Sequence, residues 1–149
     1  MNMVSRNLMI PAFEADGSLP VGLYAASEAE IVFRFGTSTR RRTELAIRLR
    51  RWIELARAVS ARRLLVDGSF VTAKPDPGDI DAAIWLPSDF QEQVARGAAA
   101  ALELNNMLRT GQPKEIFPAD DEDDWNWWIK FFSQTRIANE FKGLVEVQL

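Results

Sequence analysis

The 149-residue chain contains no cysteine and no histidine. Lack of cysteine excludes disulfide bonds and thiolate chemistry. Lack of histidine excludes catalytic triads and zinc sites that depend on imidazole, and it excludes histidine as a general base. Any chemistry must therefore rest on carboxylates, Lys, Arg, Ser, Thr, the single Tyr or a hard metal ion.

Long apolar runs are also missing. No stretch approaches the ~18 apolar residues of a membrane-spanning helix, and residues 1–11 show neither a long apolar segment nor a clear signal-peptide cleavage site. We therefore expect a cytoplasmic protein with no membrane partner. The composition, 47% apolar and 26% charged, is that of a globular protein. The length favours a single domain over residues 1–149, with residues 1–26 as an extended N-terminal arm.

The chain is organised around residues 63–86. A short apolar run, Leu64 to Val66, is followed by Gly68-Ser69, a loop with two prolines over residues 70–78, and a second apolar run over residues 80–86. This order predicts a strand, a tight turn, a loop and a second strand.

Two carboxylates stand at the start of the second strand. Residues two apart in a strand share a face, so Asp79 and Asp81 should project side by side and repel each other unless a cation lies between them. Mg²⁺ suits such a pair, and Gly68 with Ser69 offers a turn that can hold an anion. Simpler interpretations stay open: a solvated strand start for the Asp pair, a cap for Ser69, and a solvated loop residue for Lys74.

Gly68-Ser69, nine intervening residues and Asp79-Ile80-Asp81 ahead of an apolar strand resemble the motif of the polymerase-beta-like nucleotidyltransferase superfamily, particularly its minimal bacterial members. The resemblance implies an α/β (α+β) fold, a mixed β-sheet flanked by helices on one side. It also implies that Gly68, Ser69 and Lys74 bind a nucleoside triphosphate (NTP) with Mg²⁺ (or Mn²⁺), and that a nucleoside monophosphate passes to an acceptor hydroxyl. Four further segments look like an uncharacterised bacterial branch of that superfamily: residues 10–13, 19–22, 34–36 and 142–145.

In the resembled superfamily a third carboxylate comes from a later strand. A strand predicted over residues 114–118 makes Glu115 the best-placed candidate, although Asp is commoner there, and Asp120 is the alternative. The implied catalytic and metal-binding residues are Asp79, Asp81 and Glu115. Minor candidates are Asp67 for the metal and Lys142 for phosphate.

Helical periodicity and capping signals predict the flanking elements. Ser27 and Glu30 form a capping box, Gly36 ends the first helix, and Gly111 with Pro113 ends the third. Acidic residues 120–124 suit a helix N-terminus. The predicted helices cover residues 27–33, 38–61, 88–109 and 125–132, and a last strand covers residues 143–149.

Charge is distributed unevenly. Residues 1–63 hold eleven Lys and Arg against six Asp and Glu, whereas residues 64–149 hold seven against fifteen. The basic half could contact nucleic acid, or the two halves could pack on each other. The predicted helix over residues 38–61 is rich in arginine, including the triplet 40–42, and presents either a solvated face or a phosphate contact. Because aromatic residues do not interleave with the arginines, nucleic acid is not the favoured partner.

Aromatic residues lie on two faces of the helix at 125–132, which predicts a second contact surface. Its partner would be the N-terminal arm or another copy of the chain. The resemblance to minimal nucleotidyltransferases also implies a protein acceptor, as in toxin–antitoxin pairs in which one protein nucleotidylates the other, while a small molecule and an RNA end stay open as acceptors. A competing hypothesis is a catalytically weak or inactive module of the same fold that binds nucleotide or protein.

Overall fold

The computed structural model describes residues 10–110 and 115–149. In this part of the chain, one five-stranded mixed sheet packs with five α-helices, which confirms the predicted α+β fold class. The strands are β1 (Leu23–Ala26), β2 (Arg63–Asp67), β3 (Asp81–Trp85), β4 (Ile116–Ala119) and β5 (Leu144–Val147). The helices are α2 (Glu28–Phe35), α3 (Arg40–Ala58), α4 (Phe90–Ala95), α5 (Ala99–Thr110) and α6 (Glu122–Ser133), with a 3₁₀ turn η1 (Ser69–Val71).

The strand order is β1-β5-β2-β3-β4, with β2 at the centre. The β2–β3 and β2–β5 pairs are antiparallel, and the outer pairs β1–β5 and β3–β4 are parallel. Strand β1 belongs to the predicted N-terminal arm and was not predicted as a strand. It pairs with β5, with Tyr24 opposite Val145, so the end of the arm is part of the sheet.

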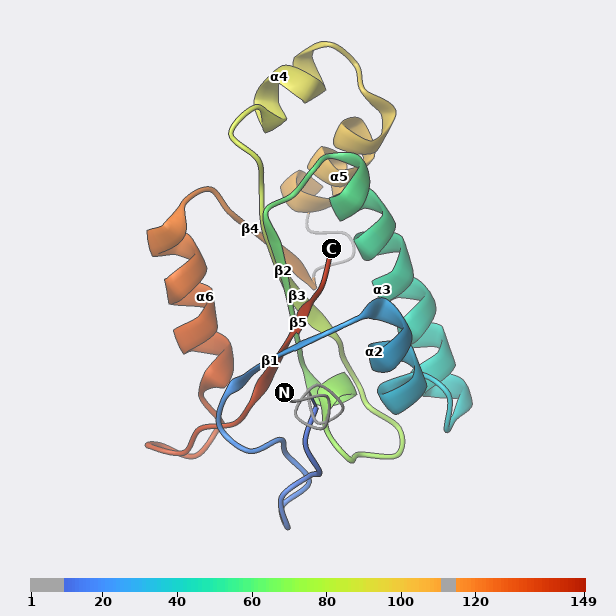
Figure 1. The fold of residues 1–149 in the computed structure, drawn as a ribbon, viewed down its shortest axis with the longest axis vertical. Helices are drawn as coiled ribbons and strands as arrows, with labels where there is room; N and C mark the ends of the chain where they lie inside the picture. Colours follow the sequence, from blue (N-terminus) through green and yellow to red (C-terminus); the bar gives the residue numbers. More distant parts are fainter. Residues whose placement is uncertain (1–9, 111–114) are drawn as a thin grey trace, which may run out of the picture.

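Helices cover both faces of the sheet: α2, α3 and α5 lie on one side and α6 on the other (Figure 1). Along β2, Leu64 and Val66 join the core under α3, while Leu65 joins a second core with Trp125 of α6. The expectation that helices flank only one side is therefore wrong. The central strands are apolar on both faces, so both faces need cover.

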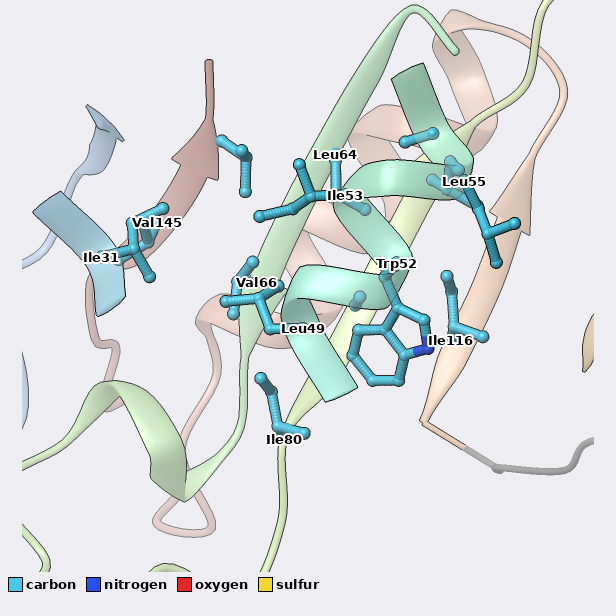
Figure 2. Packing of buried hydrophobic residues seen from close by; sticks show 14 of the residues in the cluster. Ile31, Leu49, Trp52, Ile53, Leu55, Leu64, Val66, Ile80, Ile116 and Val145 are labelled. Carbon is cyan, nitrogen blue, oxygen red and sulfur yellow. The ribbon is translucent and has the colours of Figure 1, made fainter. Parts of the chain in front are cut away.

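The larger core lies between α3 and the sheet. Figure 2 shows Leu49, Trp52 and Ile53 of α3 packed over Leu64 and Val66, and all five side chains are fully buried. Each such side chain contributes about 1.5–3 kcal/mol by leaving water. This packing fixes α3 across the strands that lead to the Asp pair.

Local capping chemistry sets the ends of the first two helices. The Ser27–Glu30 capping box is formed, and Gly36 is the C-terminal cap of α2. Thr39 accepts a hydrogen bond from the Arg42 amide at the start of α3, and the helix ends near residue 59. Both helices are confirmed.

The single helix predicted over residues 88–109 is wrong, because two helices, α4 and α5, occupy this region. Gly97 lies between them with φ +78°, a left-handed conformation that interrupts an α-helix. The predicted cap Ser88 is not used, since Asp89 occupies the cap position of α4. The predicted helix end at Gly111 and Pro113 and the predicted strand start at Lys114 lie outside the described residues.

The last predicted elements are present as β4, α6 and β5. Asp121 caps α6 by accepting a hydrogen bond from the Asp124 amide, and three further acidic residues occupy its first turn. Among the residues that the structure describes, no helix is both long enough and apolar enough to span a membrane.

Candidate functional site

The site begins where β2 ends and β3 starts. These antiparallel strands place Asp67, the last residue of β2, opposite Asp81, the first residue of β3. Gly68 then turns the chain with φ +89°. A Cβ at this position would lie 3.0 Å from Ile80 Cα and 3.1 Å from the Asp81 nitrogen. The turn therefore requires glycine for its conformation and for the close approach of the two chains.

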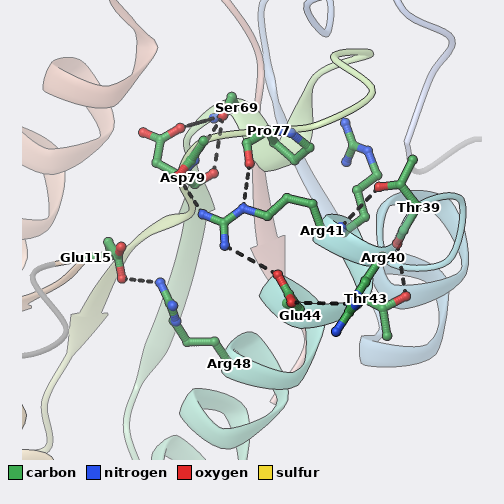
Figure 3. A network of polar contacts seen from close by, with 12 residues as sticks. Thr39, Arg40, Arg41, Thr43, Glu44, Arg48, Ser69, Pro77, Asp79 and Glu115 are labelled. Atoms are coloured by element: carbon green, nitrogen blue, oxygen red, sulfur yellow. Dashed lines mark hydrogen bonds and ion pairs between the residues drawn. The ribbon is translucent and has the colours of Figure 1, made fainter.

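Ser69 and Asp79 close the ends of the loop over residues 70–78. The Ser69 amide and hydroxyl donate hydrogen bonds of 2.8 and 2.5 Å to one carboxylate oxygen of Asp79, and the Asp79 amide donates to the Ser69 hydroxyl at 3.2 Å. These contacts appear in Figure 3. The Ser69 donors that were expected to bind an anion are thus occupied by the Asp79 carboxylate.

Asp79 precedes β3 instead of lying in it, which corrects the expectation that both acidic residues belong to one strand. The structure nevertheless brings them together, because the Asp79 and Asp81 carboxyl groups lie close enough for each to shift the pKa of the other. Asp79 lies near Asp81 because Ser69 holds it at the loop end of the hairpin, and not because the two residues share one face of a strand.

The acidic pair is electrostatically asymmetric. Burial and the neighbouring carboxylates of Asp79, Asp67 and Glu115 raise the pKa of Asp81 to about 7. Burial would also raise the pKa of Asp79, but the hydrogen bonds from Ser69 outweigh it and lower that pKa below its ordinary value. Asp81 is therefore only about half ionised near neutral pH, whereas Asp79 is ionised.

Asp67 and Lys142 form a buried pair beside these acids. Lys142 donates a short hydrogen bond to Asp67, whose side chain is almost completely buried. Burial raises the pKa of Asp67, and the Lys142 charge opposes that rise. Lys142 is thus engaged by Asp67 at the edge of the site.

Glu115 lies next to Asp81, because β3 and β4 run parallel and place Ala82 beside Ile116. Its carboxylate accepts a hydrogen bond from Arg48 of α3 at 2.6 Å (Figure 3). Asp120 follows Ala119 at the opposite end of β4, beside the far end of β3. The structure therefore favours Glu115 over Asp120 as the third acidic neighbour.

Within residues 10–110 and 115–149, no three His, Cys, Asp or Glu side chains form a ready-made metal site. The acidic residues converge, but Glu115 is held by Arg48 and Asp67 by Lys142. Lys74 is exposed and lines a hollow with residues 15–18, 72 and 73. The acidic pair is not part of that hollow.

Two residues of α3 that the sequence did not single out also contact this region. Arg41 and Arg42 donate hydrogen bonds to backbone carbonyls of the loop between Ser69 and Asp79. Their only sequence signal was the Arg triplet 40–42, which indicated a solvated face or a phosphate contact. Burial of Arg42 was not visible in that pattern.

The fold and the site together define an α+β protein with a carboxylate cluster at the loop end of its central β2–β3 hairpin. The chain belongs to the "Family of unknown function (DUF6932)", whose model matches residues 11–148. Neither the curated proteins nor the solved structures contain a significant match.

Proposed function

We propose that this protein is a metal-dependent nucleotidyltransferase that moves a nucleoside monophosphate from an NTP to an acceptor hydroxyl. The observation that carries the proposal is the convergence of Asp79 and Asp81 beside Ser69 at the end of the β2–β3 hairpin. The resemblance of Gly68-Ser69 and Asp79-Ile80-Asp81 to the nucleotidyltransferase motif supports it. A cytoplasmic setting is part of the proposal.

The donor set fits Mg²⁺ or Mn²⁺ in part. Asp79 and Asp81 supply hard oxygen ligands whose mutual repulsion a cation would relieve. Glu115 is adjacent, but it would have to leave Arg48 to become a third ligand. When bound, the metal would neutralise phosphate charge and activate the acceptor hydroxyl.

The residues around the acidic pair have separate roles in this proposal. Gly68 lets the backbone come close to the phosphates, and Ser69 offers its amide and hydroxyl to a phosphate oxygen in exchange for Asp79. The acceptor oxygen forms a bond to the α-phosphorus. The bond between the α-phosphorus and the oxygen that bridges it to the β-phosphate breaks. Pyrophosphate and the proton of the acceptor hydroxyl leave. Lys74 contributes only if its loop turns toward the phosphates.

The acceptor surface that we propose is the α6 aromatic surface, formed by Trp127 and Phe131. Their rings stack 5.1 Å apart, and their exposed fractions are 56% and 51%. A partner protein that carries the acceptor hydroxyl would cover these rings. The double substitution Trp127→Ala, Phe131→Ala should then abolish labelling of the partner but leave nucleotide binding intact. If the substitution instead lowers the molecular mass of the protein in solution, the surface joins two copies of this chain.

The test uses labelled ATP, GTP, CTP and UTP with Mg²⁺ or Mn²⁺ and a cell extract. We expect wild type and the control Asp120→Asn to transfer label, and the Asp79→Asn, Asp81→Asn double variant not to. Equal labelling by wild type and the double variant would defeat the proposal.

The alternative is a module that binds nucleotide or protein without turnover. Two observations favour it: Arg48 holds Glu115, and Asp79 occupies the Ser69 donors. The module would be supported if the protein binds Mn²⁺ and NTP without transfer to any acceptor, and if Glu115→Gln leaves that binding unchanged.

A further inference from the structure

Arg42 is a buried cation that, within the described part of the chain, donates its side-chain hydrogen bonds to backbone carbonyls and not to a carboxylate. Its exposed fraction is 4%, and its guanidinium donates to the carbonyls of Phe35 at 3.0 Å, Phe70 at 2.6 Å, Thr72 at 2.5 Å and Lys74 at 2.6 Å. Burial lowers the pKa of Arg42. Since burying a charge is costly unless its donors are satisfied, these carbonyls are what keeps the cation in place.

Its neighbours continue the same pattern along the loop. Arg41 donates to the carbonyls of Pro77 at 3.0 Å and Gly78 at 2.8 Å, and Thr39 donates to the carbonyl of Pro75 at 3.1 Å. Figure 3 shows Arg41 reaching from α3 to the residues just before Asp79. The loop carbonyls held by the start of α3 are those of Phe70, Thr72, Lys74, Pro75, Pro77 and Gly78.

The loop composition explains why outside donors are needed. Pro75 and Pro77 have no amide hydrogen, which limits the hydrogen bonds that the loop can make with itself. A planar guanidinium presents several donors in a fixed geometry and can therefore hold several carbonyls at once. The loop is thus fixed against α3, which is itself anchored in the core.

We propose that Arg41 and Arg42 are positioning residues that hold Asp79 beside Asp81, and against Ser69 until a phosphate takes the Ser69 donors. This inference rests on the proposed function, because it assigns the two arginines to the same acidic pair. Arg42 fixes the first half of the loop, and Arg41 fixes the two residues that precede Asp79. Loss of either set of hydrogen bonds lets Asp79 leave its place, although neither arginine touches the metal or substrate.

Arg41 allows a test without loss of the fold, because its side chain is 36% exposed and its removal opens no core cavity. Arg40 provides a matched control. Both arginines make a weak ion pair with Glu44, at 3.9 Å for Arg40 and 3.7 Å for Arg41. The Arg40 side chain is 94% exposed and, unlike Arg41, donates no hydrogen bond to a carbonyl of residues 70–78. Arg40→Gln and Arg41→Gln thus remove the same charge from adjacent positions.

The experiment measures Mn²⁺ binding by electron paramagnetic resonance and amide hydrogen exchange at Ser69, whose amide donates to Asp79. We expect Arg41→Gln to weaken Mn²⁺ binding by about tenfold, as loss of a residue that orients a metal ligand typically does, and to speed exchange at Ser69. Arg40→Gln should match wild type in both. Arg41→Lys, which keeps the charge without the planar fork, should fall between them.

The two levels of the proposal fail in different ways. If wild type does not bind Mn²⁺ with or without NTP, the proposed function is overturned, and exchange at Ser69 still decides whether Arg41 holds Asp79. If wild type binds Mn²⁺ and Arg41→Gln equals Arg40→Gln in binding and exchange, the positioning role is overturned. For Arg42→Lys, faster Ser69 exchange with a retained cooperative melting transition supports the role, and unchanged exchange contradicts it.

Discussion

At the residue scale, Asp81 is under electrostatic strain in the metal-free protein. Its carboxyl is partly buried and lies near Asp79, Asp67 and Glu115, which together with burial raise its pKa to about 7 from 3.8. A folded protein that keeps a proton lost by the unfolded chain becomes less stable as pH rises between these two pKa values. A residue that weakens the fold in this way is typical of a functional site.

We predict that Asp81→Asn raises the melting temperature at about pH 8 in EDTA by roughly 2–4 °C, which corresponds to about 1 kcal/mol after allowance for solvent screening. Below about pH 3, where Asp81 is largely protonated in both the folded and the unfolded chain, the two proteins should melt alike. Thermal unfolding across this pH range checks the prediction.

The exposed Asp120 offers a control, since Asp120→Asn should leave the pH dependence of wild type unchanged. If the Asp81→Asn variant has a lower melting temperature than wild type near pH 8, the carboxylate stabilises the fold, contrary to the electrostatic argument.

At the element scale, α6 has a buried and an exposed aromatic face. Trp125 is fully buried against Trp85, with ring centres 6.0 Å apart, and the Arg63 guanidinium lies 4.9 Å from its ring centre. Trp127, two residues on, is 56% exposed. Tryptophan thus packs in the core at position 125 and is available to a partner at position 127.

Trp125→Ala should lower the free energy of unfolding by about 3–5 kcal/mol, because it leaves a cavity between α6 and the sheet. Trp127→Ala should change it by no more than about 0.5 kcal/mol. Urea unfolding of the two variants gives both values, and a similar loss in both would contradict the assignment of the two faces.

At the scale of the whole molecule, the basic N-terminal half packs against the acidic C-terminal half. Cross-half ion pairs join Arg48 to Glu115, Arg51 to Glu103 and Arg63 to Glu146. Burial of Arg42 removes one more cation from the surface. These contacts favour internal packing over a nucleic-acid surface as the reason for the charge asymmetry.

We therefore predict that the protein binds RNA no more tightly than non-specific association allows, with a dissociation constant of about 10⁻⁶ M or weaker near physiological salt. Fluorescence anisotropy with a labelled oligonucleotide over a salt series measures this. Tight binding that weakens steeply with salt would instead assign the arginines to phosphate contacts.

Much of the secondary structure could be predicted from local patterns. The capping box at Ser27, the apolar stripe of α3 and the acidic start of α6 each lie within a few residues of the element they specify. The Gly68-Ser69 turn and the nearby Asp pair were also predictable, since their spacing along the chain is short. The break at Gly97 within the predicted helix over residues 88–109 was missed, in contrast, because glycine also occurs within helices, and its left-handed conformation shows only in the folded chain.

By itself, then, the sequence determined most of the element types, the α+β class and the position of the carboxylate pair, because these depend on neighbouring residues. Only the tertiary structure decided that β1 joins β5, that α6 covers the second face, that Arg48 holds Glu115 and that Arg42 is buried under the loop. Each of these is a contact between residues far apart in the chain. Such contacts depend on how the elements pack, which local sequence patterns do not encode.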